Sequence, residues 1–326
     1  MKAIRLDRFD GPDGLEVVTL PKPQPGAGEV LVRVRASGVN FFETLMLRDR
    51  YAVTPALPMV PGVEVAGEIE AVGVGVGFPG VGARVAVPLF AIGRGSGGYA
   101  EYITVDAASV VPLPDGLPFD TAVALMVQGL TAVHLVRQSQ PKGKSVLVNA
   151  AAGGVGSLLA QLAKDAGARR VIAAASTPEK LRCARSLGAD VGVDYSRADW
   201  PDHVIEASGG VGADVIYEMI GGTQTKASLA ALAPGGEMIF GAMGRFALVP
   251  ADMERMFQKN QSIRGFSLLP LLSQPDFRAD LCHLFERAAS GGLKLLPGSH
   301  YPLEQAAEAH SALENRRTIG KVVLKP

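Results

Sequence analysis

The first third of the chain is a succession of short runs in which apolar and polar residues alternate, beginning with the N-terminal MKAIRL. Period-two alternation is typical of half-buried β-strands, and the glycines and prolines between the runs mark turns. One segment, residues 40–49, instead carries its apolar residues at helical spacing. The pattern predicts a β-rich module with few helices, with further strands at residues 29–39, 63–73, 83–89 and 100–106.

The pattern changes near Phe119, where residues 119–138 form long apolar segments of helical type. From Ser145 to about Ser267, short apolar runs alternate with helical segments, which is typical of a parallel sheet covered by helices. Six strands in this rhythm predict a doubly wound α/β fold. The expected strands are residues 145–150, 170–175, 190–195, 213–219, 235–242 and 261–267.

The C-terminal part contains two amphipathic helical segments, residues 277–291 and 303–315, and a closing strand, KVVLKP. These pieces are too few to fold alone, so we expect them to return to the N-terminal module. The predicted domains are therefore residues 1–122 with 268–326, and residues 123–267.

Length and composition narrow the function classes. A chain of 326 residues is long enough for two domains, and Lys plus Arg balance Asp plus Glu at 32 each. A neutral chain has no global attraction to nucleic acid or to anionic membranes, so neither is an expected partner. Two cysteines cannot form a disulfide framework, and the sequence has neither a signal-peptide pattern nor an 18-residue apolar stretch. We expect a cytoplasmic protein.

The most specific chemical signal is a glycine-rich turn between an expected strand and an expected helix, in residues 145–168. Ala151, Gly153 and Gly156 occupy the three small-residue positions of the dinucleotide-binding G-x-G-x-x-G pattern, and Gly154 and Val155 lie between them. Small residues let the backbone approach a pyrophosphate, which the free N–H groups and dipole of the helix N-terminus bind. We expect a dinucleotide at this turn.

The end of the second strand of this domain indicates which dinucleotide. NAD-binding chains have an acidic residue there for the ribose 2′-hydroxyl. This chain has Ser176 and Thr177, with Lys180 one turn into the next helix. A hydroxyl and an ammonium suit a 2′-phosphate, so the predicted cofactor is NADP(H).

With these features, the chain resembles the zinc-independent medium-chain dehydrogenases/reductases of the quinone oxidoreductase (zeta-crystallin-like) family. The similarity extends over nearly the whole chain. It is carried by SGVNFFETLMLR, LPMVPGVEVAGEIEAVG, GGYAEY, QGLTAVHLV, NAAAGGVG, VDY, IRGF and RRTIGKVVL. The resemblance implies a GroES-like catalytic domain, an inserted Rossmann domain, a cleft between them, and a homodimer or homotetramer joined through the nucleotide-binding sheet.

The resemblance also implies roles for individual residues. Asn40 and Thr131 would lie near the nicotinamide ribose and carboxamide, and Tyr51 at the substrate mouth. The backbone at Phe240, Gly241 and Phe266 would line the cofactor groove. The adenosine 2′-phosphate would be bound by Ser176, Lys180, Tyr195 and Arg316, with Arg317 as the alternative to Arg316.

The chain departs from the zinc dehydrogenases of the wider superfamily at their metal ligands. Those enzymes carry a cysteine where this chain has Asn40, and the sequence GHE where it has Gly62, Val63 and Glu64. A catalytic zinc needs about three protein ligands, so no metal site is expected and Glu64 is expected to be a buried structural carboxylate. Leu45 stands where related quinone reductases often have tyrosine, which predicts a more apolar substrate pocket.

Without zinc to polarise an alcohol, reduction of an electron-poor acceptor is the expected reaction. NADPH would transfer a hydride to a quinone or an α,β-unsaturated carbonyl, with Tyr51 as a candidate hydrogen-bond donor to the developing oxyanion and Asn40 beside the nicotinamide. One alternative is a 2-enoyl thioester reductase, with Arg48, Arg50 and Arg94 as candidate phosphate contacts. The other is a non-catalytic NADPH-binding protein.

Overall fold

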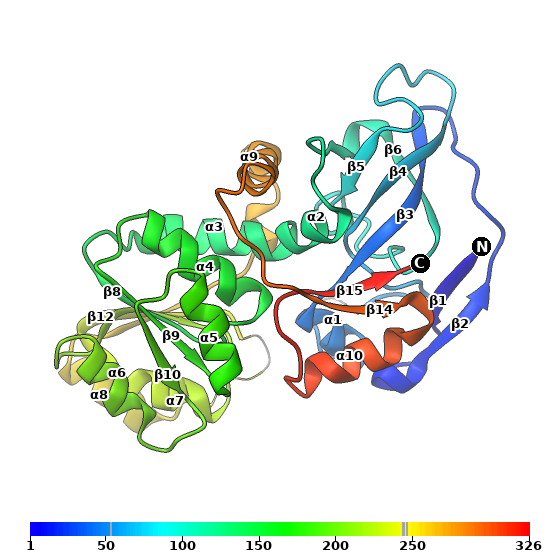
Figure 1. Cartoon of the computed structure of the whole chain (residues 1–326). Helices are drawn as coiled ribbons and strands as arrows, with labels where there is room; N and C mark the ends of the chain where they lie inside the picture. Colours follow the sequence, from blue (N-terminus) through cyan, green and yellow to red (C-terminus); the bar gives the residue numbers. More distant parts are fainter. Residues whose placement is uncertain (53, 243–244, 246, 275) are drawn as a thin grey trace. The chain divides into compact units, whose positions relative to one another are not determined.

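The computed structural model describes residues 1–52, 54–242, 245, 247–274 and 276–326, and the chain divides into two compact units (Figure 1). Unit 1 comprises Met1–Gly129 with Leu272–Pro326, and unit 2 comprises Leu130–Leu271. The C-terminal residues thus belong with the N-terminal module. The first division falls inside a helix, at Gly129/Leu130.

Unit 1 is built on a seven-stranded sheet in the order β14-β15-β3-β4-β5-β7, with β6 also paired to β3. Its strands are β3 (Glu29–Val39), β4 (Val65–Val72), β5 (Arg84–Val87), β6 (Tyr102–Asp106), β7 (Val111–Pro112), β14 (Ser299–Pro302) and β15 (Val322–Lys325). A separate antiparallel pair is formed by β1 (Lys2–Leu6) and β2 (Leu15–Thr19).

The long strand β3 organises this unit because it pairs with β4, β6 and β15. Alternate apolar side chains of these strands, Val32, Ile69 and Ile103 among them, form one buried cluster. The antiparallel pairing of Val322 with Val39 brings the C-terminal strand against the end of β3. Residues that directly precede Val322 and directly follow Val39 are therefore neighbours.

The N-terminal part of unit 1 contains few helices, as the sequence pattern predicts, and the C-terminal part adds the two expected from its amphipathic segments. The helices of the unit are α1 (Phe41–Met46), α2 (Phe119–Leu125), the first turn of α3 (Val127–Ser139), α9 (Phe277–Ala289) and α10 (Ala306–Glu314). Short 3₁₀ turns occupy Gly11–Gly14, Leu89–Ala91, Ala107–Ser109 and Leu303–Gln305.

Unit 2 is a parallel six-stranded sheet in the order β10-β9-β8-β11-β12-β13. Its strands are β8 (Ser145–Val148), β9 (Arg170–Ala175), β10 (Val191–Asp194), β11 (Ala213–Glu218), β12 (Leu232–Phe240) and β13 (Ser262–Gly265). Numbered within the unit, this order is 3-2-1-4-5-6, that of the doubly wound dinucleotide-binding fold. The connecting helices are α4 (Gly154–Asp165), α5 (Pro178–Ser186), α6 (Trp200–Ala207), α7 (Thr223–Ala230) and α8 (Pro250–Gln258). The predicted doubly wound sheet is confirmed.

The helical segment Phe119–Ser139 is long and apolar enough to cross a membrane by length and composition alone. However, 67% of its most apolar window is buried inside the molecule. A buried core helix passes the same test, since its apolar faces are covered by protein.

Candidate functional site

The glycine-rich turn joins β8 to α4 in unit 2, as the sequence predicts. The N–H of Ala151 donates to Ala174 O at 3.0 Å, which ties the turn to the neighbouring strand β9. A Cβ on Gly156 would lie 2.3 Å from Ala150 O, so only glycine lets the helix pass this close to the turn.

The N-terminus of α4 has the features of an anion-binding site. Its N-cap, Gly153, has no side chain to cap the helix, so the first N–H groups of α4 remain available to an outside acceptor. A Cβ on Gly153 would meet only Ala150 O, at 3.2 Å, which leaves open space at the turn. The turn formed by Ala151, Gly153, Gly154, Val155 and Gly156 therefore fits a dinucleotide pyrophosphate.

A buried polar group, which we did not predict, holds the strand ends beside this turn. Asn149 Nδ2 donates to Glu218 Oε2 at 2.6 Å and to Ser228 Oγ at 2.7 Å. Glu218 Oε1 accepts from the N–H groups of Ile220 and Gly221, at 2.7 and 2.8 Å. These contacts fix the carboxyl ends of β8 and β11, where a doubly wound sheet binds its ligand.

The residues predicted to distinguish NADP(H) from NAD(H) lie together at the end of β9. Ser176 follows this strand directly, and Thr177 is the N-cap of α5, its hydroxyl accepting from Lys180 N at 3.2 Å. The N–H of Tyr195 donates to Ala175 O at 3.1 Å, so Tyr195 lies next to Ser176 in the fold. Ser176 and Lys180 are partly exposed, and Tyr195 is largely buried.

The other predicted groove residues of unit 2 come from the ends of β12 and β13. The N–H of Phe266 donates to Phe240 O at 2.9 Å, which places Phe266 beside Gly241. Gly241 packs against Met219, with an added Cβ 2.7 Å from Met219 Sδ. Thr131 is partly exposed on α3.

In unit 1, Asn40 lies in a buried cluster of five polar side chains: Asn40, Glu43, Glu64, Gln128 and Lys321. The Lys321 ammonium donates to Glu64 Oε1 at 2.5 Å, Gln128 Oε1 at 2.8 Å and Asn40 Oδ1 at 2.9 Å. Glu64 is completely buried, and its other oxygen accepts from Val127 N at 2.9 Å. We call this group the buried polar cluster.

The side chain of Asn40 is saturated within the cluster. Its Nδ2 donates to Glu64 Oε1 at 2.9 Å and to Glu43 Oε2 at 3.0 Å, and its Oδ1 accepts from Gln128 Nε2 at 2.7 Å as well as from Lys321. An amide has two donors and two acceptor positions, so every one is used. The side chain of Asn40 is thereby held in one orientation.

Burial changes the protonation of this cluster. Burial raises the pKa of Glu43 to about 7, even though the contact with Asn40 and the charge of Lys321 oppose the rise. One oxygen of Glu43, Oε1, has no hydrogen-bond partner. Burial also lowers the pKa of Lys321, against the opposing charge of Glu64. Near neutral pH, the buried carboxyl group of Glu43 therefore exchanges a proton.

Tyr51 follows α1 in the chain and stacks on Phe42, with the ring centroids 5.0 Å apart. Burial raises the pKa of Tyr51, and the charge of Glu43 adds to the rise. The phenol therefore keeps its proton at neutral pH and can donate a hydrogen bond. Leu45, on the same short helix, is partly exposed.

Unit 1 also contains a buried hydrogen-bonded pair, formed by Tyr99 and His310. Tyr99 Oη and His310 Nε2 are 3.0 Å apart, and both residues are fully buried. Burial, with the nearby charge of Arg48, lowers the pKa of His310 to about 3. His310 is therefore a neutral packing residue at physiological pH.

Within the described residues, no three His, Cys, Asp or Glu side chains gather in an arrangement that could hold a metal ion. The segment that carries Asn40 and the segment that carries Glu64 do meet in the buried polar cluster. Where they meet, the cation is the ammonium of Lys321.

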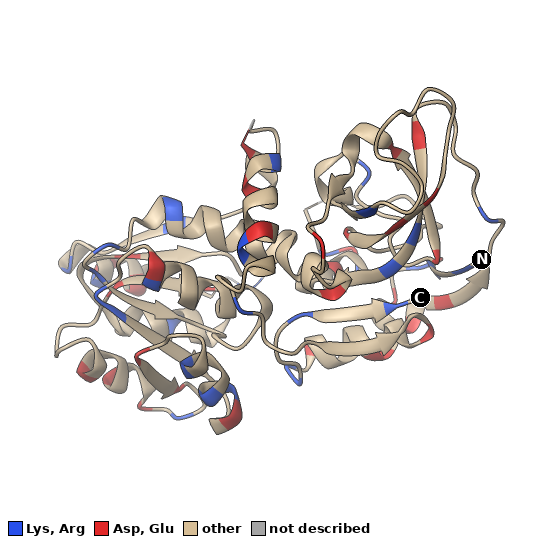
Figure 2. Ribbon diagram, turned by 45° about the horizontal axis from the view of Figure 1, so that its top comes forward, with Lys and Arg blue, Asp and Glu red and all other residues tan. Residues whose placement is uncertain are grey.

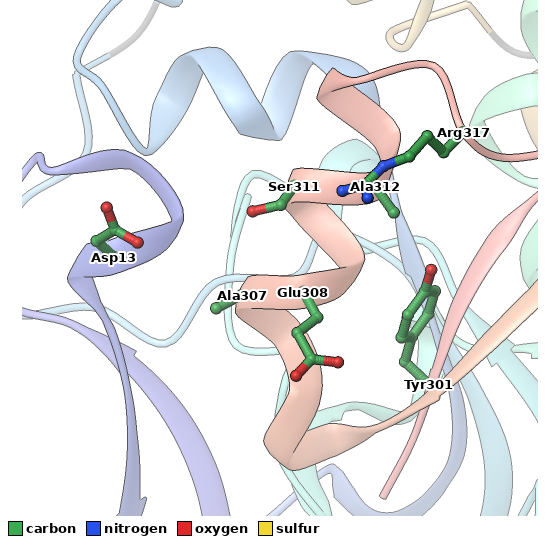
Figure 3. Close-up of a pocket in the computed structure, with 7 residues that line it drawn as sticks. All are labelled: Asp13, Tyr301, Ala307, Glu308, Ser311, Ala312 and Arg317. Atoms are coloured by element: carbon green, nitrogen blue, oxygen red, sulfur yellow. The ribbon is translucent and has the colours of Figure 1, made fainter.

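A surface pocket of about 610 Å³ lies in unit 1 along α10 (Figure 3). Glu308, Ser311 and Arg317 contribute polar groups, and Tyr301 and Asp13 complete its wall. Arg317 is the alternative candidate for the 2′-phosphate, and it lies on unit 1, as does the exposed Arg316. Ser176, Lys180 and Tyr195 belong to unit 2.

The structure thus brings together the turn residues and the residues at the end of β9, each within unit 2, and it places Asn40 in unit 1. Lys321, Glu43 and Gln128 were not predicted as site residues. Lys321 lies between a glycine and an apolar run in GKVVL, a pattern that does not distinguish a buried lysine from a solvated one.

Known proteins provide an independent comparison. A family model for the alcohol dehydrogenase GroES-like domain matches residues 26–115, and one for zinc-binding dehydrogenases matches residues 154–287. A quinone oxidoreductase of Pseudomonas aeruginosa is 35% identical over 329 residues, covering 100% of this chain and 99% of the relative. The chain belongs to the quinone oxidoreductase family.

Family membership confirms the resemblance seen in the sequence, with its GroES-like domain and Rossmann-type sheet. A relative with a different name is about as similar to this chain. A 2-haloacrylate reductase of a Burkholderia species is 34% identical over 337 residues, covering 98% of each chain.

Solved structures of the family have the same fold over their whole length. The quinone oxidoreductase of Thermus thermophilus, determined also in complex with NADPH, is 34% identical with a TM-score of 0.83. A structure named as an NAD-dependent alcohol dehydrogenase is 33% identical with a TM-score of 0.87. Each match covers 100% of both chains.

Proposed function

We propose that this protein is an NADPH-dependent oxidoreductase that transfers a hydride to a quinone or another electron-poor α,β-unsaturated carbonyl, without zinc. The observation that carries the proposal is full-length membership of the quinone oxidoreductase family together with a glycine turn that fits a dinucleotide. The protein is an oxidoreductase, and its cofactor is NADP(H), as in the complex of the Thermus thermophilus relative.

Several groups of this chain would hold the cofactor. The N–H groups at the start of α4 would bind the pyrophosphate, and Ser176 and Lys180 would bind the 2′-phosphate, with Tyr195 beside them and Arg316 from unit 1. Thr131 and the backbone at Phe240, Gly241 and Phe266 would line the nicotinamide half. When bound, NADPH supplies a hydride to the acceptor carbon or quinone ring.

The remaining chemistry is a proton transfer, because a quinone that accepts a hydride becomes a quinol only on gaining one proton. We assign Tyr51 as the hydrogen-bond donor to the developing oxyanion, since its phenol is protonated at neutral pH. Asn40 would act from the buried polar cluster by fixing the backbone around the nicotinamide, because its side chain has no free hydrogen-bonding group.

A second acceptor class is supported by the 2-haloacrylate reductase relative, whose substrate is an acrylate. An enoyl thioester would need a phosphate contact near the substrate. Of the candidate arginines, Arg48 is paired with Glu314 at 2.9 Å, and Arg94 donates to the carbonyl of Thr104. Two of the three are therefore already engaged, which favours small acceptors over acyl-CoA or acyl-carrier-protein thioesters.

We expect the enzyme to work in the cytoplasm as a homodimer or homotetramer. Its expected partner is the small-molecule substrate, and we expect it to bind neither nucleic acid nor a membrane. The balanced charge supports the absence of a nucleic-acid or membrane partner, since Lys and Arg are interspersed with Asp and Glu over both units (Figure 2).

The test is steady-state oxidation of NADPH, and of NADH in parallel, with matched panels of 1,4-quinones, small enones and crotonyl-CoA, each with and without a chelator. The proposal expects turnover of quinones or enones that prefers NADPH and does not respond to the chelator. Preference for crotonyl-CoA would favour the thioester reductase. Tight NADPH binding without turnover of any acceptor would favour the non-catalytic alternative.

A further inference from the structure

Lys321 is the one buried lysine among the residues that the structure describes. Its side chain is 4% exposed and that of Glu64 is completely buried. All three N–H bonds of the ammonium meet oxygens, and these come from three separate segments: Asn40 after β3, Glu64 before β4, and Gln128 in the first turn of α3. An ammonium removed from water is stable only with such full coordination.

The fold makes room for this group. Because Val322 pairs with Val39, the antiparallel register places Lys321 next to Asn40. Gly38 lies beside them, and a Cβ there would be 2.4 Å from Glu64 Oε1 and 2.8 Å from Lys321 Cε. Because Gly38 has no side chain, strand β3 leaves space for the ion pair of Lys321 and Glu64.

The ammonium also determines the orientation of two amides. An ammonium can only donate, so it requires the oxygen of Asn40 and the oxygen of Gln128 to face it. The nitrogen of Asn40 must then point at Glu43 and Glu64, as observed. Without the cation, the oxygen of Asn40 would accept only from Gln128 Nε2, the oxygen of Gln128 would lose the donor that faces it, and Glu64 would be a buried charge without a counterion.

We propose that Asn40, Glu64 and Gln128 form an oxygen-lined cation site which the chain fills with the ammonium of Lys321, and that Lys321 is thereby the positioning residue for Asn40. The second part rests on the proposed function, because it assigns Asn40 to the nicotinamide side of the reaction. The first part is independent of any activity. The site takes a small monovalent cation with N–H donors, such as an alkylammonium ion, when its own lysine is removed.

Thermal unfolding tests the cation site. Lys321→Met should lower the melting temperature by about 5–10 °C, because it leaves Glu64 buried and unpaired. The matched control is Lys325→Met at the end of β15, whose side chain is 40% exposed and 3.5 Å from Asp120. It should change the melting temperature by no more than about 2 °C. The double variant Glu64→Gln/Lys321→Met should regain at least half of the loss, because no unpaired charge remains.

Added cations give the second measurement. Lys321→Ala should melt at a higher temperature in ethylammonium chloride than in tetramethylammonium chloride at equal concentration, because only the former ion has N–H donors and fits the vacated volume. The wild type and Lys325→Ala should show no such difference. Equal melting of Lys321→Met and Lys325→Met, or the absence of an ethylammonium effect specific to Lys321→Ala, would overturn the cation site.

Kinetics test the positioning role. Lys321→Met should lower kcat for quinone or enone reduction about tenfold or more. Its affinity for adenosine 2′,5′-bisphosphate should be unchanged, since the buried polar cluster is not among the groups proposed to bind the 2′-phosphate. Ethylammonium should restore part of the kcat of Lys321→Ala. Wild-type kcat in Lys321→Met would overturn the positioning role. If the wild type itself reduced no acceptor, the proposed function would fail while the melting temperatures still decided the cation site.

Discussion

Among single residues, Glu43 makes the stability of the protein depend on pH in an unusual direction. Its pKa is raised by burial from 4.5 to about 7 in the folded chain. Between these values the folded chain keeps a proton that the unfolded chain has released, so Glu43 makes the folded state less stable as pH rises through this window. Above about pH 7 both states are ionised and this contribution no longer changes.

Glu43→Gln should therefore flatten that dependence. At about 1.4 kcal/mol for each pKa unit, the variant should gain roughly 3 kcal/mol relative to the wild type between about pH 4.5 and pH 7. Urea unfolding at a series of pH values measures the difference. Glu254→Gln, at an exposed position of α8, is the control and should parallel the wild type. Parallel curves for Glu43→Gln would show that Glu43 does not hold this proton.

Tyr51 is the proposed hydrogen-bond donor to the developing oxyanion of the acceptor. Tyr51→Phe removes the phenol and keeps the ring that stacks on Phe42, so we expect kcat to fall on the order of 10²-fold while NADPH affinity is retained. Tyr102→Phe, in β6, should leave both unchanged. Full turnover by Tyr51→Phe would mean that Tyr51 only packs against the site.

Ser176 carries the cofactor preference. Ser176→Asp places a carboxylate at the end of β9, where it should repel a 2′-phosphate and accept from a 2′-hydroxyl. We expect KM for NADPH to rise about tenfold to a hundredfold and KM for NADH to fall. Ser186→Asp, at the far end of α5, is the control. An unchanged ratio of the two KM values would place the phosphate elsewhere.

The turn residues and Ser176 could be predicted from the sequence, whereas Lys321 and Glu43 could not, and the reason is physical. The turn residues and Ser176 belong to a local motif, so their spacing along the chain already determines their geometry. Lys321 and Glu43 become a site only through pairing between β15 and β3, more than 270 residues apart. Nothing local distinguishes a lysine that is buried in such a pairing from a solvated one.

Among the elements, strands with strong apolar alternation were the most predictable. Strand β3 has the predicted bounds, and β9 does as well. Strands β2 and β14 were not predicted, because Leu15–Thr19 is mostly exposed and Ser299–Pro302 has no apolar alternation. The predicted helix over residues 119–138 is divided into α2 and α3 at Met126, whose ψ of −84° departs from helical geometry.

The junction of β8 and α4 gives a prediction at this scale. Gly156→Ala forces a Cβ against Ala150 O, so it should lower both the melting temperature and NADPH affinity. A Cβ at Gly153 would contact only Ala150 O, at 3.2 Å, so Gly153→Ala should leave the melting temperature within about 2 °C of the wild type. The same variant should lower NADPH affinity, because the new methyl group occupies the space proposed for the pyrophosphate. Differential scanning calorimetry and NADPH fluorescence titration measure both quantities. Equal effects of the two variants on stability would contradict this account of the turn.

For the whole molecule, the order of elements was sufficient to predict two units, with the C-terminal residues returning to the first. The β-rich pattern before residue 119 and the strand-helix rhythm after residue 145 differ enough to separate them. The exact division was less predictable, because α3 is a continuous helix that contributes Gln128 to unit 1 and Leu130 onward to unit 2. A continuous helix has no local signal at such a division.

The central claim is that this protein transfers a hydride directly from NADPH to its acceptor. The most direct measurement is a single-turnover reaction with NADPH deuterated stereospecifically at nicotinamide C4, with a small enone and with a 1,4-quinone as acceptors. The account predicts one NADP⁺ for each reduced product, a primary isotope effect for one of the two C4 positions, and deuterium at the β-carbon of the reduced enone. NADPH that binds but is not consumed, or a product formed without deuterium transfer, would contradict it.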